Sequence, residues 1–222
     1  MAFHSALRQD KIKHNPCIGI ESLPEESIER EPFTAGEIGN LLKAAQGDWK
    51  GAILFAYYTG ARLGDVANMR WRAIDLEKRL ITLVPEKTKR RKKKAIAVPL
   101  HPELEKQLLK RPGVGAASLF PSVCGRESGG RYGLSAEFAA IMKRAGVHGQ
   151  VVKHTENGRA NRTKSFHSLR HSFNSALANA GVGRELRQVL TGHASERMNE
   201  IYTHRELEPI RNAIEAMPRV FV

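Results

Sequence analysis

The sequence predicts an α+β domain that is mostly helical and carries one small antiparallel three-stranded β-sheet. Apolar residues recur every three or four positions in most segments, which is the spacing that buries one face of a helix. Runs rich in β-branched residues are confined to residues 71–100, where they predict the strands. The chain has 222 residues, of which 41% are hydrophobic, and this is enough for one sizeable core.

Residues 1–31 are predicted to be a linker or arm and not a packed domain. The segment is polar, is interrupted by Pro16 and Pro24, and ends in a cluster of charged residues. It has no apolar stretch of the kind found in secretory signals, and no part of the chain approaches the ~20 apolar residues of a membrane span. Cys17 and Cys124 are far apart and form no paired motif. We therefore expect a cytoplasmic protein with no membrane partner.

Helices are predicted from residue 34 onward. Thr34 and Glu37 form the pattern of a capping box, which opens the first helix. A strongly apolar helix follows and ends at Gly60, and Arg62 begins the next one. After the strands, Ser165 is the expected N-cap of a helix that stops at Gly181. The remaining helices are predicted over residues 103–110, 134–144, 184–190 and 205–218.

Three strands are predicted around residues 74–76, 80–84 and 95–98. Between the last two lies the run from Lys87 to Lys94, in which seven of eight residues are basic. Such a turn repels itself unless a polyanion screens its charge. The net charge of +13 also indicates a polyanionic partner, and it favours nucleic acid over a membrane.

The stretch from Ser165 to Tyr202 concentrates groups that can perform chemistry. His167 and Arg170 lie three residues apart in a helical pattern, so their side chains share one face. His193 follows a short helix, and Tyr202 stands nine positions further on. A guanidinium binds phosphate in bidentate fashion, imidazoles move protons near neutral pH, and a phenol can be a covalent nucleophile. These groups indicate phosphoryl transfer, and no motif in the sequence predicts a metal site or a cofactor.

Arg62 is expected to bind a phosphate. Its charge at the start of a helix opposes the helix dipole, so a purely structural arginine would be better placed at the other end. The structural alternative is a salt bridge to Asp65. We expect Asp65 to orient Arg62 and not to take part in the chemistry.

These motifs, in this order, resemble the tyrosine recombinases, also called phage-type integrases. The resemblance runs from about residue 34 to residue 216. Thr191 and Asn174 depart from the family pattern, which usually has leucine and a small apolar residue at these positions. The matching motifs are Thr59-Gly60-Ala61-Arg62, Glu86-Lys87-Thr88-Lys89 with Val98-Pro99-Leu100, His167-Ser168-Leu169-Arg170, Leu190-Thr191-Gly192-His193 and Ile201-Tyr202.

The resemblance implies a reaction in which Tyr202 attacks a scissile DNA phosphate, leaving a 3′-phosphotyrosyl link and a free 5′-hydroxyl. Arg62 and Arg170 would hold the phosphate, His167 would accept or relay the tyrosine proton, and His193 would hydrogen-bond the phosphate.

The family pattern also requires a lysine as general acid, and it assigns that role to Lys87, with Lys89 as the alternative. The rest of the basic run would bind DNA, namely Lys89, Arg90, Arg91, Lys92, Lys93 and Lys94.

The resemblance further implies that residues 32–222 form the catalytic domain and that the usual N-terminal DNA-clamping domain is absent. The chain is then a fragment, which we favour, or a naturally truncated protein. The expected partners are double-stranded DNA and other protomers, with a tetramer on DNA and a monomeric isolated domain. The C-terminal helix, 205–218, would pack on its own core or dock on a neighbouring protomer.

Three other functions compete with recombination as explanations of these motifs. A type IB topoisomerase-like enzyme would use the same chemistry without strand exchange. A silent DNA-binding regulator would have a broken set of catalytic residues, whereas this set is intact. A metal-dependent transposase needs a carboxylate cluster, which the sequence lacks. The sequence leaves open the target DNA and whether the host element is a phage, an integrative element or a chromosome-resolution system.

Overall fold

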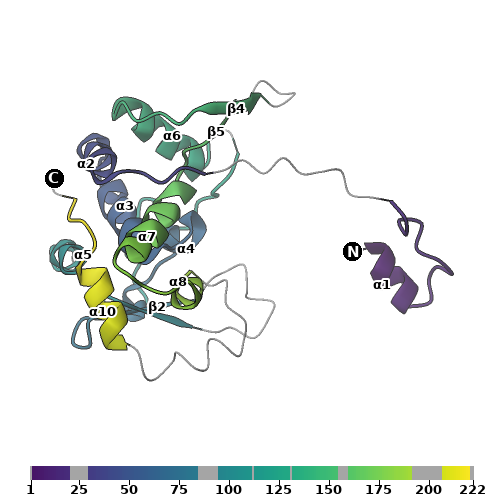
Figure 1. Cartoon of the computed structure of the whole chain (residues 1–222), viewed down its shortest axis with the longest axis horizontal. Helices are drawn as coiled ribbons and strands as arrows, with labels where there is room; N and C mark the ends of the chain where they lie inside the picture. Colours follow the sequence, from purple (N-terminus) through teal and green to yellow (C-terminus); the bar gives the residue numbers. More distant parts are fainter. Residues whose placement is uncertain are drawn as a thin grey trace.

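The computed structural model of the chain describes residues 2–20, 30–84, 95–111, 113–130, 132–154, 160–191 and 207–220. It confirms the predicted fold class, because most of its elements are helices and three strands form one antiparallel sheet, which lies at the lower edge of the view in Figure 1. A short helix that the sequence did not predict, α1 (Ala2–Arg8), buries none of its residues and lies apart from the other elements.

Helix α2 (Ala35–Ala44) opens with the predicted capping box. Thr34 Oγ1 accepts from Glu37 N at 3.2 Å, and Glu37 Oε2 accepts from Thr34 N at 2.9 Å. These bonds satisfy donors that a helix start otherwise leaves unpaired. The helix then turns Ile38, Leu41 and Leu42 into the core.

Helix α3 (Asp48–Thr59) is the centre of the fold. It is buried on nearly every side and packs against α2, α4 (Leu63–Ala67), α5 (Pro102–Leu108) and α7 (His167–Asn179). It ends where predicted, because Gly60 adopts a left-handed conformation with φ of +65°.

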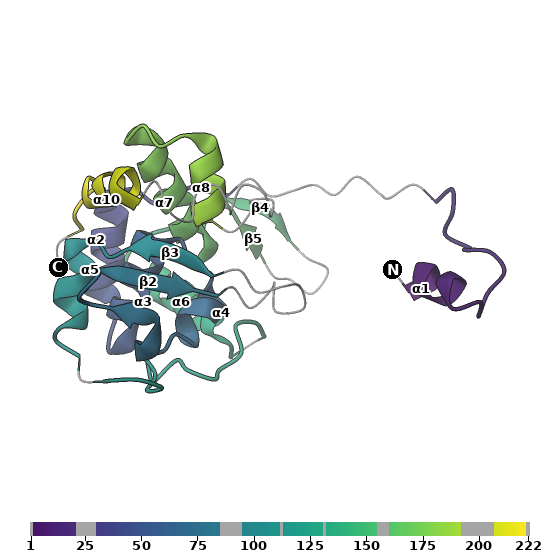
Figure 2. The same ribbon diagram turned by 90° about the horizontal axis from the view of Figure 1, so that it is seen from below.

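The sheet has the order β1–β2–β3 and is antiparallel throughout. Its strands are β1 (Ile74–Asp75), β2 (Leu80–Leu83) and β3 (Ile96–Pro99). The pairs Ile81–Val98 and Leu83–Ile96 place four buried side chains on the core face. Figure 2 shows α8 (Arg184–Leu190) and α10 (Leu207–Glu215) beside β3, the edge strand of this sheet.

Helix α10 packs on the core of its own chain. Ile210, Ala213, Ile214 and Met217 are buried, which is the first of the two alternatives that the sequence left open. The chain after this helix is held by Tyr57 and Tyr58, whose hydroxyls each lie 3.3 Å from the carbonyl oxygen of Pro218.

A second sheet was not predicted. Strands β4 (Val151–His154) and β5 (Ala160–Arg162) pair in antiparallel fashion after α6 (Leu134–Arg144). Val151 and Val152 are 44% and 53% exposed, so no core-facing alternation marked these strands in the sequence.

The expected N-cap of α7 was wrong. The residue before the helix is Phe166, which makes no side-chain cap. Ser165 instead donates its backbone N–H to Ser168 Oγ at 3.1 Å, because the chain enters the helix through a turn that pairs Ser168 N with Ser165 O. The predicted stop is confirmed, since Gly181 has a φ of +79°.

Candidate active site

The turn between α3 and α4 presents Arg62. Thr59 Oγ1 donates to Phe55 O at 2.6 Å and accepts from Ala61 N at 3.2 Å, so the hydroxyl holds both sides of the turn. Arg62 follows in an extended conformation as the residue that precedes α4. Because the turn is anchored on the most buried helix, the position of the Arg62 backbone is well defined.

Arg170 lies in the first turns of α7, and its side chain is buried, with 6% of the residue exposed. Its Nη1 donates to the carbonyl oxygen of Gly60 at 2.8 Å, which joins residues 110 positions apart in the chain. Its Nη2 is also buried and has no hydrogen-bond partner among the described residues. Burial and, to a smaller extent, the nearby charge of Arg62 lower the pKa of Arg170 to about 10, and Asp65 opposes the shift.

A buried guanidinium nitrogen without a partner is costly, and an oxyanion is the group that would satisfy it. The charge of Arg62 lies near that of Arg170, so the two guanidinium groups are suited to an anion. Asp65, which was expected to orient Arg62, is close enough to Arg170 to act on the charge of that residue as well.

His167 stands three residues before Arg170 at the surface end of the same helix. Loss of hydration lowers the pKa of His167 to about 4, and His171, Arg170, Arg62 and Arg30 shift it in the same direction. The ring of His167 remains accessible to solvent. His167 is then neutral near pH 7 and able to accept a proton.

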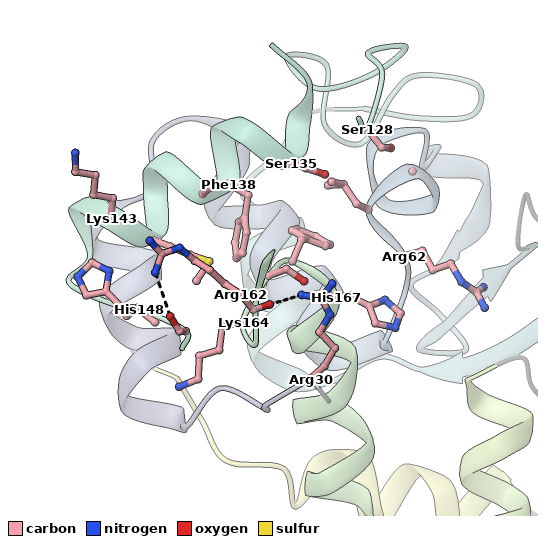
Figure 3. A pocket seen from close by; sticks show the side chains of 18 residues that line it. Arg30, Arg62, Ser128, Ser135, Phe138, Lys143, His148, Arg162, Lys164 and His167 are labelled. Atoms are coloured by element: carbon pink, nitrogen blue, oxygen red, sulfur yellow. Dashed lines mark hydrogen bonds between the residues drawn. The ribbon is translucent and has the colours of Figure 1, made fainter. Parts of the chain in front are cut away.

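Three cavities surround these residues. One of about 370 Å³ is lined by Arg62, Asp65, Arg170 and Thr191, and it reaches the ends of β2 and β3. A second, of about 760 Å³, shares Arg62 and His167 with the site (Figure 3). A third, of about 240 Å³, adjoins His167 and Arg170 on the side of α8.

The predicted site residues between β2 and β3, and those after α8, lie outside the described residues: Lys87, Lys89, Arg90, Arg91, Lys92, Lys93, Lys94, His193 and Tyr202. Val84 and Thr191, the last described residues before two of the gaps, both line the 370 Å³ cavity.

Sequence reasoning missed two residues of this site. His171 packs its ring edge-on against His167, with 5.1 Å between the ring centres, and helical spacing of four residues could have revealed it. Arg30 comes from the segment assigned to the linker, and it lines the 760 Å³ cavity with Arg62 and His167. No local pattern signals Arg30, because its place depends on how the linker folds back.

Within the described parts of the chain, no three His, Cys, Asp or Glu side chains gather as metal ligands would. No helix of these parts is long and apolar enough to cross a membrane.

Comparison with known proteins adds a family and a fold. Residues 32–208 match the sequence model described as the phage integrase family. A tyrosine recombinase XerC-like protein of Caldanaerobacter subterraneus subsp. tengcongensis is 26% identical over 262 residues, covering 99% of this chain and 63% of that protein. The chain thus spans less than two thirds of the length of this relative.

Two solved structures share the fold. The integrase from mycobacterium phage Brujita gives a TM-score of 0.63 at 24% identity, over 100% of this chain and 70% of that one. A lambda integrase dimer bound to a COC′ core site gives a TM-score of 0.56 at 21% identity, over 89% of this chain and 69% of that one.

Proposed function

The chain belongs to the phage integrase family, and on that premise we propose that it performs site-specific DNA recombination by cutting and rejoining DNA strands. The observation that carries the proposal is the buried guanidinium of Arg170 beside Arg62. One of its nitrogens is held by Gly60 and another has no partner among the described residues, so the pair suits a phosphate oxygen.

In the proposed reaction Tyr202 Oη attacks the scissile phosphorus, a bond forms between them, and the bond from phosphorus to the 5′-oxygen breaks. Arg62 and Arg170 take the non-bridging oxygens, where negative charge gathers in the transition state. The phenol proton passes to His167, which is neutral near pH 7 and so has an unprotonated ring nitrogen that can accept it.

Lys87, or Lys89 in its place, donates a proton to the departing 5′-oxygen. His193 hydrogen-bonds the phosphate. Asp65 helps to orient the arginine pair, and its influence on the charge of Arg170 supports that role. Loss of one charged phosphate ligand should cost on the order of 3 kcal/mol, or about a hundredfold in rate.

The covalent link conserves the energy of the phosphodiester bond. The 5′-hydroxyl of a second strand can therefore reverse the step and complete strand exchange with no external energy source. The partners are double-stranded DNA and further protomers, which complete a tetramer with this chain on the recombining DNA. The lambda integrase dimer on its core site supports DNA as the substrate. The basic run from Lys89 to Lys94 binds the DNA backbone, since its charge complements phosphate.

The test is a trap for the covalent intermediate. The chain is incubated with EDTA on nicked duplexes that carry candidate attachment sequences, so that cleavage releases a short fragment and cannot be reversed. A denaturing gel then reports any protein–DNA adduct. We expect an adduct with the native chain and none with Tyr202→Phe.

Binding to a site without any adduct would contradict the proposal and favour a DNA-binding regulator. Adducts that relax supercoiled DNA without exchanging strands would favour a topoisomerase-like enzyme.

A further inference from the structure

The segment just before α2 is held against the helix that carries His167 and Arg170. Phe33 N donates to Ser172 Oγ at 2.8 Å, and this hydroxyl lies 3.0 Å from the carbonyl oxygen of Phe33. Ser172 is buried on α7, two residues after Arg170. On the other side, Glu31 N donates to Thr163 O at 3.1 Å. The segment is thus bonded both to α7 and to the chain that leads into it.

This attachment places Arg30 at the rim of the 760 Å³ cavity. Its Nη1 donates to Arg162 O at 2.5 Å, and Figure 3 shows its side chain close to that of His167. Arg62 and His167 line the same cavity. The charge of Arg30 is close enough to His167 and His171 to contribute to the lowered pKa of both rings.

The cavity is strongly basic. Five arginine or lysine side chains and two histidines line it, and none of its lining residues is acidic. Lys164 has its own carboxylate partner, since it pairs with Glu37. No carboxylate of the described residues pairs with Arg30. Among the described residues, the side chain of Arg30 donates one hydrogen bond, to a carbonyl. A guanidinium offers five N–H groups, so this bond leaves most of its donors available.

We propose that Arg30 binds a second phosphate of the DNA strand, adjacent to the phosphate held by Arg62 and Arg170. The inference rests on the proposed function, because that function places the scissile phosphate at the arginine pair. The sharing of one cavity by Arg30, Arg62 and His167 makes a continuous backbone the ligand that fits best. The linker then contributes to the catalytic surface itself.

The test is the salt dependence of binding to a short duplex of arbitrary sequence, which needs no knowledge of the target site. Each phosphate contact adds about 0.9 to the slope of log K against log salt. We expect Arg30→Gln to lower that slope by about 0.9 and to weaken binding about eightfold in 0.1 M salt. Glutamine can still donate to the Arg162 carbonyl, so the linker contact is kept while the charge is removed. Arg30→Lys should restore most of the slope.

The matched control is Arg144→Gln. Arg144 is exposed and donates to the Ala44 carbonyl at 3.3 Å, as Arg30 does to Arg162, but it lines none of the three cavities. Its loss removes the same charge and should leave the slope near that of the native chain. An unchanged slope in Arg30→Gln, or an equal fall in Arg144→Gln, would overturn the inference.

The covalent trap separates this inference from the proposed function. If the native chain forms an adduct and Arg30→Gln leaves the salt-dependence slope unchanged, the second phosphate site is disproved and the recombination proposal stands. If Arg30→Gln lowers the salt-dependence slope but no adduct forms with the native chain, the phosphate contact stands and the proposed cleavage reaction is disproved.

Discussion

Arg170 donates a hydrogen bond from Nη1 to the carbonyl oxygen of Gly60 at 2.8 Å. This bond joins helix α7 to the turn that presents Arg62, and it sets one guanidinium beside the other. It also leaves Arg170 Nη2 buried without a partner among the described residues. The guanidinium groups of Arg62 and Arg170 are therefore positioned for an anion before one binds. A preorganised site of this kind lowers the activation free energy of the reaction.

Replacing Arg170 by lysine should slow adduct formation about a hundredfold, or by ~3 kcal/mol of barrier. An ammonium keeps the charge, but it has no planar fork that can bond Gly60 and a phosphate together. Single-turnover cleavage of the nicked duplex measures the effect. Arg144→Lys serves as the control for the same exchange on the surface. A rate within threefold of the native chain would show that the fork is dispensable.

Gly60→Ala should destabilise the chain more than Gly181→Ala. Both positions have positive φ, +65° and +79°, so an alanine is strained at each. At Gly60 the new Cβ would also lie 2.6 Å from Phe173 Cδ1, whereas at Gly181 nothing lies within 4 Å. We expect Gly181→Ala to cost ~1 kcal/mol and Gly60→Ala clearly more, as measured by urea unfolding. Equal losses would mean that Phe173 moves aside without cost.

The free energy of unfolding should fall as the pH falls from about 6.5 to about 4. Burial lowers the pKa of His101 to about 4, and its ring stacks on Tyr58 with 3.8 Å between the ring centres. The folded chain therefore keeps His101 neutral in a pH range where the unfolded chain protonates it. Stability that is present above pH ~6.5 is lost through that window, with a slope of up to ~1.4 kcal/mol per pH unit.

Urea unfolding of His101→Asn across this range gives the measurement. The slope of this variant should be shallower by up to one proton, although the variant is less stable at every pH. Replacing the surface residue His14 by glutamine is the control. Parallel slopes for the native chain and His101→Asn would contradict the assignment.

Asn174→Ala should slow adduct formation several-fold. Arg187 Nη1 donates to Asn174 Oδ1 at 3.1 Å, its Nε donates to Val182 O at 3.0 Å, and Thr191 Oγ1 donates to Arg187 O at 2.7 Å. Asn174 and Thr191, the two residues that depart from the family pattern, thus both hydrogen-bond to Arg187. Through it α8 is tied to α7, and α8 ends three residues before His193.

The loss of one such bond is worth about 1 kcal/mol, or roughly fivefold. The rate of adduct formation should recover in Asn174→Asp, which still accepts from Arg187, if the bond positions the site. Loss of activity in both variants, with unchanged melting temperatures, would argue that the amide acts in some other way.

Much of the fold could be predicted because its signals are local. The capping box at Thr34, the stop at Gly60 and the alternation in β2 and β3 involve residues within a few positions of one another. The family was predicted from the order of its motifs and is confirmed by the match over residues 32–208. The roles of the site residues stay predictions, namely those of Arg62, Asp65, Lys87, His167, Arg170, His193 and Tyr202.

The elements that were missed lack such local signals. Strands β4 and β5 turn no apolar face to a core, and Val151 and Val152 are exposed. Arg30 reaches the site only because Phe33 is bonded to Ser172, 139 residues away in the chain.

The sequence by itself determined which residue types the site contains and which helices, turns and strands carry them. The tertiary structure alone decided that Arg170 bonds Gly60, that Arg30 joins the cavity of Arg62 and His167, and that Arg187 ties α8 to α7. The physical reason is the sequence separation of the interacting groups, because helix hydrogen bonds and caps join residues only about four positions apart. The contacts that build the site form only when α3 and α7 pack together and bury the groups between them.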